Sequence, residues 1–161
     1  MNEDELDEQV PLSIPIRGRV SGPMSSNQWA LVWFTLIEHP WTSIVIVPAE
    51  VNASSIAVAR ALTDVGNTYE EQGVQLIEAE RLPPPIARHV IATMTKRADS
   101  GARTVVAVAS PLVDYNAIPI ARAADASVLL VKVGATALSD AKKTVNMIGR
   151  QCFIGSITSD G

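Results

Sequence analysis

The sequence predicts a three-layer α/β domain built on a mostly parallel sheet of about five or more strands. Short apolar runs rich in β-branched residues, such as residues 43–47, alternate with longer segments whose apolar residues recur at helical spacing. Hydrophobic residues make up 47% of the 161 residues, which is enough for one domain with a substantial core. Parallel strands need crossover connections, and these place helices on both faces of the sheet.

Helix and strand signals alternate without interruption from residue 25 onward. The first helix is expected to begin at Ser25 or Ser26 and to be closed by Pro40. Strands are expected over residues 43–47, 74–79, 104–109, 127–133 and 153–157. The helices between them are expected from residue 54 to residue 66 or 73, and over residues 86–97, 116–124 and 139–148.

The first 23 residues differ from the rest in composition. Pro11, Pro15 and Pro23 interrupt them, no sustained periodicity appears, and five acidic residues lie among the first eight. We therefore expect residues 1–23 to form a disordered acidic arm and residues 24–161 to form a single domain.

Charge and cysteine content exclude several classes of function. The net charge of −4 falls mainly on the arm, so the body is close to neutral and offers no net attraction for nucleic acid or an anionic membrane. The single cysteine, Cys152, excludes an intrachain disulfide and a cysteine-based zinc site. No apolar run is long enough to span a bilayer, and no signal peptide begins the chain. These features predict a cytoplasmic protein.

The first strand-to-helix connection is where a ligand is expected, because ligands of open α/β sheets bind beyond the carboxyl ends of the strands. Its length and position match a phosphate-binding loop, G-x-x-x-x-G-K-[ST]. Glycines are replaced there by Pro48 and Ala53, and the lysine by Ser54, so only Ser55 keeps the expected type. The candidate loop positions are Pro48, Glu50, Asn52, Ala53, Ser54 and Ser55.

Each replacement weakens phosphate binding. Proline has no amide hydrogen, and a Cβ at Ala53 obstructs the close approach that glycine permits. Serine cannot neutralise phosphate charge as lysine does, and Glu50 adds a repelling carboxylate. We therefore predict no tight binding of a nucleoside triphosphate, although the amides at the helix N-terminus could still hold an anion weakly.

Residues 115–136 (YNAIPIARAADASVLLVKVGAT) read as a helix, a buried strand and a Gly-x-Thr turn. This stretch, and the order of elements over roughly residues 28–157, resemble the deviant Walker A (MinD/ParA-type) P-loop ATPases. Within that group the sequence is most similar to the cytoplasmic bacterial tyrosine kinase domains of polysaccharide export systems. The resemblance implies a P-loop NTPase-like fold, and a membrane-embedded regulator of polysaccharide chain length as a partner at the inner face of a bacterial membrane.

The catalytic motifs of that family are degenerate in this sequence. Residues 107–111 lack the family's magnesium-organising aspartate, and Glu78 and Glu80 replace the two aspartates of its second acidic motif. Only Tyr69 and Tyr115 are tyrosines, so no tyrosine cluster awaits phosphorylation. We expect a non-catalytic pseudokinase acting as an interaction module, without catalytic residues, bound metal or cofactor, and without a nucleic-acid partner.

Two alternatives stay open. An atypical ATPase or tyrosine kinase would hold magnesium with Ser55 and Glu78 or Glu80 and be completed by a partner subunit. The candidate donors of the missing cation are Lys132, Arg81 and Arg122. A positioning protein of the MinD/ParA type would bind DNA or membrane, which the near-neutral body disfavours.

The family associates through the helix before the first strand, so Trp29 and Trp33 are candidate residues of an interaction face and the chain is a candidate homo-oligomer. The other interpretation of these tryptophans is a stripe packed on the core.

Overall fold

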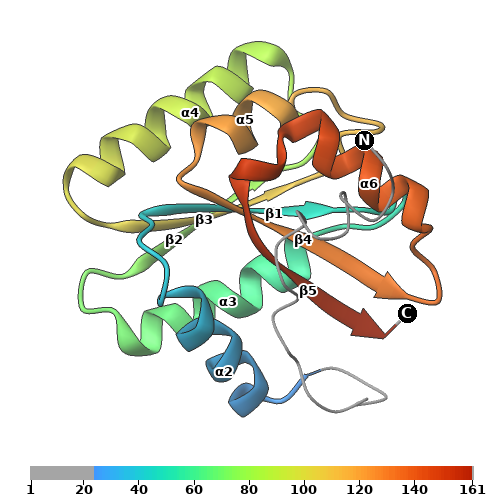
Figure 1. The fold of residues 1–161 in the computed structure, drawn as a ribbon. Coiled ribbons are helices and arrows are strands. Elements are labelled where there is room, and N and C mark those ends of the chain that lie inside the picture. Colours follow the sequence, from blue (N-terminus) through green and yellow to red (C-terminus); the bar gives the residue numbers. More distant parts are fainter. Residues whose placement is uncertain (1–23, 161) are drawn as a thin grey trace.

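Five strands form one parallel sheet in the order β2-β3-β1-β4-β5 (Figure 1). The computed structural model describes residues 24–160, so the arm expected at residues 1–23 lies outside the described residues. The strands are β1 (Ser43–Pro48), β2 (Val74–Ala79), β3 (Arg103–Val108), β4 (Ala126–Val133) and β5 (Phe153–Asp160).

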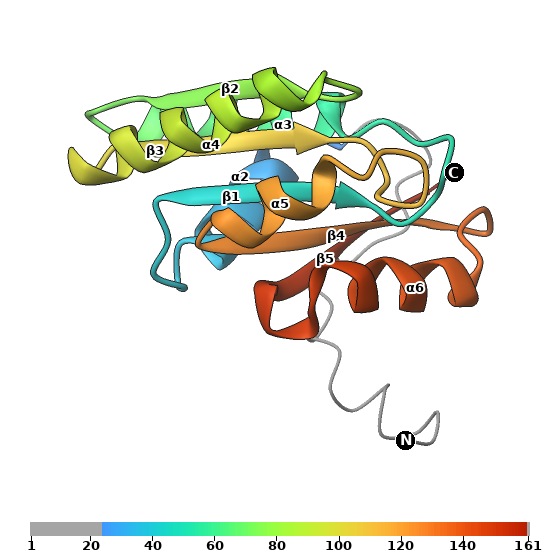
Figure 2. The ribbon, with the colours of Figure 1, turned by 90° about the horizontal axis from the view of Figure 1, so that it is seen from above.

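Helices cover both faces of the sheet, which confirms the predicted three-layer architecture (Figure 2). One layer contains α2 (Ser26–Leu36) and α3 (Ile56–Tyr69). The other contains α4 (Pro84–Asp99), α5 (Ala117–Ala123) and α6 (Leu138–Ile148), and the short 3-10 helix η1 (Arg150–Cys152) joins α6 to β5. Among residues 24–160, no helix combines the length and the apolar character needed to cross a bilayer.

The central strand β1 is buried along its whole length and pairs with β3 on one side and β4 on the other. Its β-branched residues suit a parallel strand that is covered on both faces. Since all five strands run in the same direction, the loops that follow β1, β2, β3 and β4 gather at the carboxyl edge of the sheet.

The stripe of apolar residues on α2 packs against the sheet. Trp33 is 0% exposed, and its ring meets that of Trp41 edge-on with the centroids 5.7 Å apart. A Cβ at Gly66 of α3 would lie only 2.7 Å from Cη2 of Trp33, so glycine is needed for this close approach. The indole ring of Trp33 therefore packs α2 directly against α3.

The predicted interaction face is therefore wrong for Trp33. Helical spacing turns both tryptophans of α2 toward the core, and Trp29 packs half-buried against the same cluster. The exposed apolar side chains of this layer are Leu31 and Phe34 on α2 and Tyr69 on α3, and the rings of Phe34 and Tyr69 lie 4.8 Å apart.

Several element boundaries differ from those expected. Helix α4 begins at Pro84, two residues earlier than expected, because proline is compatible with the first turn of a helix. Helix α2 ends at Leu36, well before Pro40. The carbonyl of Leu36 accepts the His39 N–H at 3.1 Å and the indole N–H of Trp41 at 2.9 Å. Helix α3 begins only at Ile56, and β5 extends to Asp160.

Asp125 joins the starts of β1 and β4 at the amino edge of the sheet. Its Oδ2 accepts hydrogen bonds from the Thr42 N–H and hydroxyl, both at 2.7 Å, and from the Ser43 N–H at 3.3 Å. Partial burial by itself raises the pKa of Asp125, but these hydrogen bonds to the charged form outweigh it and lower the pKa below its usual 3.8.

Replacing Asp125 by asparagine is expected to make stability less dependent on acid pH. A carboxyl group whose pKa is lower in the folded state stabilises the protein above its unfolded pKa, and this contribution disappears as the pH falls through the folded pKa. The gap in urea midpoint between wild type and Asp125→Asn should therefore be constant above about pH 5 and close toward about pH 2. A gap that stays constant throughout that range would contradict the prediction.

Candidate functional site

The connection from β1 to α3, residues 49–55, lies at the carboxyl edge of the sheet. Pro48 is the buried last residue of β1, and the Ala49 N–H donates to the carbonyl of Leu130 on β4 at 3.0 Å. A turn follows in which the Ala53 N–H donates to the Glu50 carbonyl at 3.2 Å. Glu50 is half-buried and Asn52 is exposed. The predicted loop therefore has the expected place in the fold.

Ser55, the one residue that keeps the phosphate-loop type, faces into the protein. Its hydroxyl is 0% exposed and donates to the carbonyl of Val108, the last residue of β3, at 2.7 Å. The hydroxyl thus joins the loop to β3. Because the hydroxyl is fully buried, a magnesium ion could reach its oxygen only if the surrounding loop moved.

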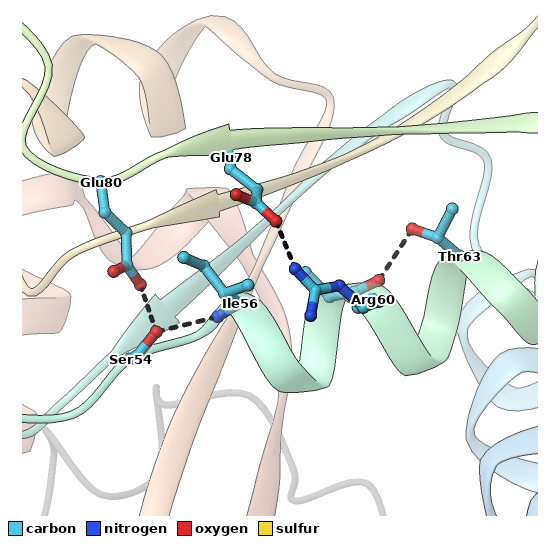
Figure 3. A network of polar contacts seen from close by, with 7 residues as sticks. Ser54, Ile56, Arg60, Thr63, Glu78 and Glu80 are labelled. Carbon is cyan, nitrogen blue, oxygen red and sulfur yellow. Dashed lines mark hydrogen bonds and ion pairs between the residues drawn. The ribbon is translucent and has the colours of Figure 1, made fainter.

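Glu80 fills the position that an anion would take at the start of α3. Its Oε1 accepts a hydrogen bond from the Ser54 hydroxyl at 2.8 Å (Figure 3). The same oxygen accepts the Ser55 N–H at 3.0 Å. The Ser54 oxygen in turn accepts the Ile56 N–H at 3.2 Å. Because the N-terminus of a helix attracts negative charge, this carboxylate occupies the Ser55 amide and the Ser54 hydroxyl, which a bound phosphate would otherwise use.

Glu78 turns to the same helix. It lies two residues before Glu80, on the same side of the strand, and its Oε1 meets Nη2 of Arg60 at 2.6 Å (Figure 3). Both side chains are largely exposed, at 60% for Arg60 and 47% for Glu78, so this ion pair adds little stability. Both glutamates of the predicted acidic motif therefore point toward the first turns of α3. Glu80 binds Ser54 and Ser55, and Glu78 binds Arg60.

The described residues contain no group of three or more His, Cys, Asp or Glu side chains that could hold a metal ion. Of the three candidate cation donors, Arg122 is engaged elsewhere. Arg122 donates to the carbonyls of Met147 and Ile148 at the end of α6, both at 2.9 Å. Lys132 lies on β4, and Arg81 follows Glu80 in the turn after β2.

Asp114 was not among the predicted site residues, but it organises the neighbouring loops. It is 8% exposed, and its two oxygens accept the Arg81 N–H at 2.8 Å and the Asn116 N–H at 3.1 Å. Arg81 adopts a φ of 57°, which this bond helps to hold. The side-chain amide of Asn116 donates through Nδ2 to the Leu82 carbonyl at 2.6 Å. The Asp-x-Asn spacing of Asp114 and Asn116 is typical of a turn, and it was the sequence signal that could have identified Asp114.

An open hollow lies beside these loops, lined by Arg81, Leu82, Val113 and Asp114. Asp114 uses its carboxylate on backbone amides, so the chemistry left in the hollow is the Arg81 guanidinium and the apolar surface of Leu82 and Val113. These groups could contact a ligand or a partner, but they do not form an acid–base pair.

Comparisons with known proteins agree with this fold. No family model and no curated protein matches the sequence. Among solved structures, the crystal structure of the chimerical protein CapA2B2 matches with a TM-score of 0.71 and 11% identity, covering 98% of this chain and 98% of that chain. The chain therefore has a P-loop NTPase-like α/β fold, which it shares with that protein. The predicted fold class is confirmed, and the structural likeness agrees with the predicted resemblance. A shared fold does not by itself establish an activity.

Proposed function

We propose that this chain is a non-catalytic pseudokinase that acts as an interaction module. The observation that carries the proposal is the Glu80 carboxylate bound at the start of α3, on the Ser54 hydroxyl and the Ser55 N–H. A nucleotide phosphate would have to displace this carboxylate and would then face the negative charge that it displaced. Phosphoryl transfer depends on neutralising phosphate charge, and this loop carries negative charge instead.

The chemistry of the loop supports the same proposal. Glu50 is the one charged residue from Pro48 to Ser55, no lysine stands at position 54, and the Ser55 hydroxyl is bound to the Val108 carbonyl. The alternative, an atypical enzyme completed by a partner, needs Ser55 and either Glu78 or Glu80 to be free for magnesium. The Ser55 hydroxyl is buried, and Glu80 and Glu78 each bind a donor at α3 or the loop before it, so these observations favour the non-catalytic module.

The proposed setting is the synthesis or export of a bacterial exopolysaccharide at the cytoplasmic face of the inner membrane. The fold shared with CapA2B2 supports this setting, as does the resemblance of residues 115–136 to polysaccharide-export kinase domains. The module would dock on the cytoplasmic end of a membrane-embedded regulator of chain length and regulate it without phosphorylating it. The exposed Leu31, Phe34 and Tyr69 offer an apolar surface for such contacts or for self-association.

Isothermal titration of the purified chain with MgATP and with MgADP tests the proposal, and no saturable binding is expected up to millimolar nucleotide. Capture on the immobilised chain should at the same time retain the chain-length regulator from membranes of the native cell, with or without nucleotide. Micromolar MgATP affinity with measurable hydrolysis would overturn the non-catalytic assignment. Failure to retain the regulator would overturn the proposed setting while leaving that assignment intact.

A further inference from the structure

Charge is divided unequally between the two helical layers, although the body as a whole is close to neutral. The layer of α4, α5, α6 and η1 (residues 84–99, 117–123 and 138–152) carries seven basic residues and two acidic ones. The opposite layer, α2 and α3 (residues 26–36 and 56–69), carries one basic residue, Arg60, and one acidic residue, Asp64. The near-zero net charge of the body therefore conceals one layer that is rich in basic residues.

Exposed basic residues lie on all three helices of this layer. α4, α5 and α6 pack side by side on one side of the sheet (Figure 1). Arg88 and Lys96 on α4 and Lys143 on α6 are exposed, and Arg122 on α5 is exposed while it donates to carbonyls of α6. The acidic residues of this layer, Asp99 and Asp140, lie at the end of α4 and at the start of α6.

Large apolar side chains border this face at the carboxyl edge of the sheet. Ile86 in the first turn of α4 is 48% exposed, and Leu138 at the start of α6 is 66% exposed. Between them, Val113 and Tyr115 in the loop before α5 are 53% and 73% exposed. Exposed apolar side chains gathered beside basic ones mark an interaction surface.

We propose that the layer of α4, α5 and α6 docks peripherally on an anionic membrane, with Ile86, Val113, Tyr115 and Leu138 entering the interface. Basic residues are attracted to anionic lipids, and tyrosine and aliphatic side chains gain from burial at the boundary between headgroups and acyl chains. A nucleic acid would use the basic residues but not this apolar border. The proposal stands on surface charge and exposure, so it holds or fails independently of nucleotide binding.

Co-sedimentation with vesicles tests the proposal on the full chain, including the acidic residues 3–8. Binding is expected to vesicles of equal parts phosphatidylglycerol and phosphatidylcholine, not to phosphatidylcholine alone, and to weaken as salt is raised. The pair Lys96→Gln and Lys143→Gln should weaken binding by about 5-fold for each residue. The matched control is Ala57→Glu with Asn27→Glu, which lowers the net charge equally but at exposed positions of the opposite layer.

The control pair should leave vesicle binding within about 2-fold of wild type, because its charges lie on the far side of the molecule. Tyr115→Ser with Leu138→Ser keeps the net charge and should also weaken vesicle binding. Absence of binding to anionic vesicles, equal losses in the two charge-matched pairs, or no loss in the serine pair would each overturn the proposal. So would tighter binding to duplex DNA than to vesicles at the same salt.

Discussion

Replacing Trp33 by alanine is expected to lower the free energy of unfolding by about 3–5 kcal/mol. The side chain is 0% exposed, and it fills the space between Trp41 and Gly66. Removing it leaves a cavity that the surrounding core cannot close, because Gly66 has no side chain to move into it. Urea unfolding followed by far-ultraviolet circular dichroism measures the loss.

Two control variants separate packing from other roles of the tryptophans. Trp33→Phe should lose much less than Trp33→Ala, because it keeps most of the ring volume and removes an indole N–H that has no partner among the described residues. Trp29→Ala should also lose less, because Trp29 is only half-buried. If Trp33→Ala kept its urea midpoint but changed the oligomeric state in light scattering, Trp33 would belong to an interface after all.

The elements of this fold could be predicted because its local signals are strong. Residues 74–79 were predicted as a strand with the bounds observed for β2, and the β-branched run in β1 marked the buried centre of the sheet. The strand order β2-β3-β1-β4-β5 does not follow from such signals, since pairing joins residues far apart in the chain. The sequence therefore predicted a mostly parallel sheet but not its strand order.

The site was only half predictable, for a similar reason. The missing lysine and glycines at Pro48, Ala53 and Ser54 can be read directly from the sequence. The contact that fills the loop joins Glu80 to Ser54 and Ser55, 26 and 25 residues away, and depends on the turn after β2 reaching the start of α3. The sequence identified Glu80 as part of a degenerate acidic motif, but it could not show that the Glu80 carboxylate binds Ser54 and Ser55.

Replacing Glu80 by alanine is expected to lower the free energy of unfolding by about 1–2 kcal/mol. The carboxylate accepts two hydrogen bonds at the positive end of α3, one from a hydroxyl and one from an amide. Because Glu80 is only half-buried, water can replace part of the lost hydrogen bonding in the variant. The loss of stability is therefore smaller than for a fully buried carboxylate. Urea unfolding at neutral pH measures it.

Glu78→Ala is the matched control, since it removes an equal charge from the same edge of the sheet but breaks only an exposed ion pair with Arg60. Its loss should stay below about 0.5 kcal/mol. Ser54→Ala with Glu80→Ala should lose less than the sum of the two single variants, because one hydrogen bond is counted in both. Additive losses would contradict a direct contact between these side chains.

Glu80→Gln separates the charge from the hydrogen bonds. Glutamine keeps an oxygen that can accept the Ser55 N–H but loses the attraction to the helix dipole, so its stability should fall between wild type and Glu80→Ala. If Glu80 is the internal substitute for a bound anion, inorganic phosphate should protect Glu80→Ala from unfolding more than it protects wild type. MgATP should protect no better than phosphate, because the loop still lacks its lysine and glycines. Strong protection by MgATP would mean that Glu80 alone had blocked an otherwise competent nucleotide site.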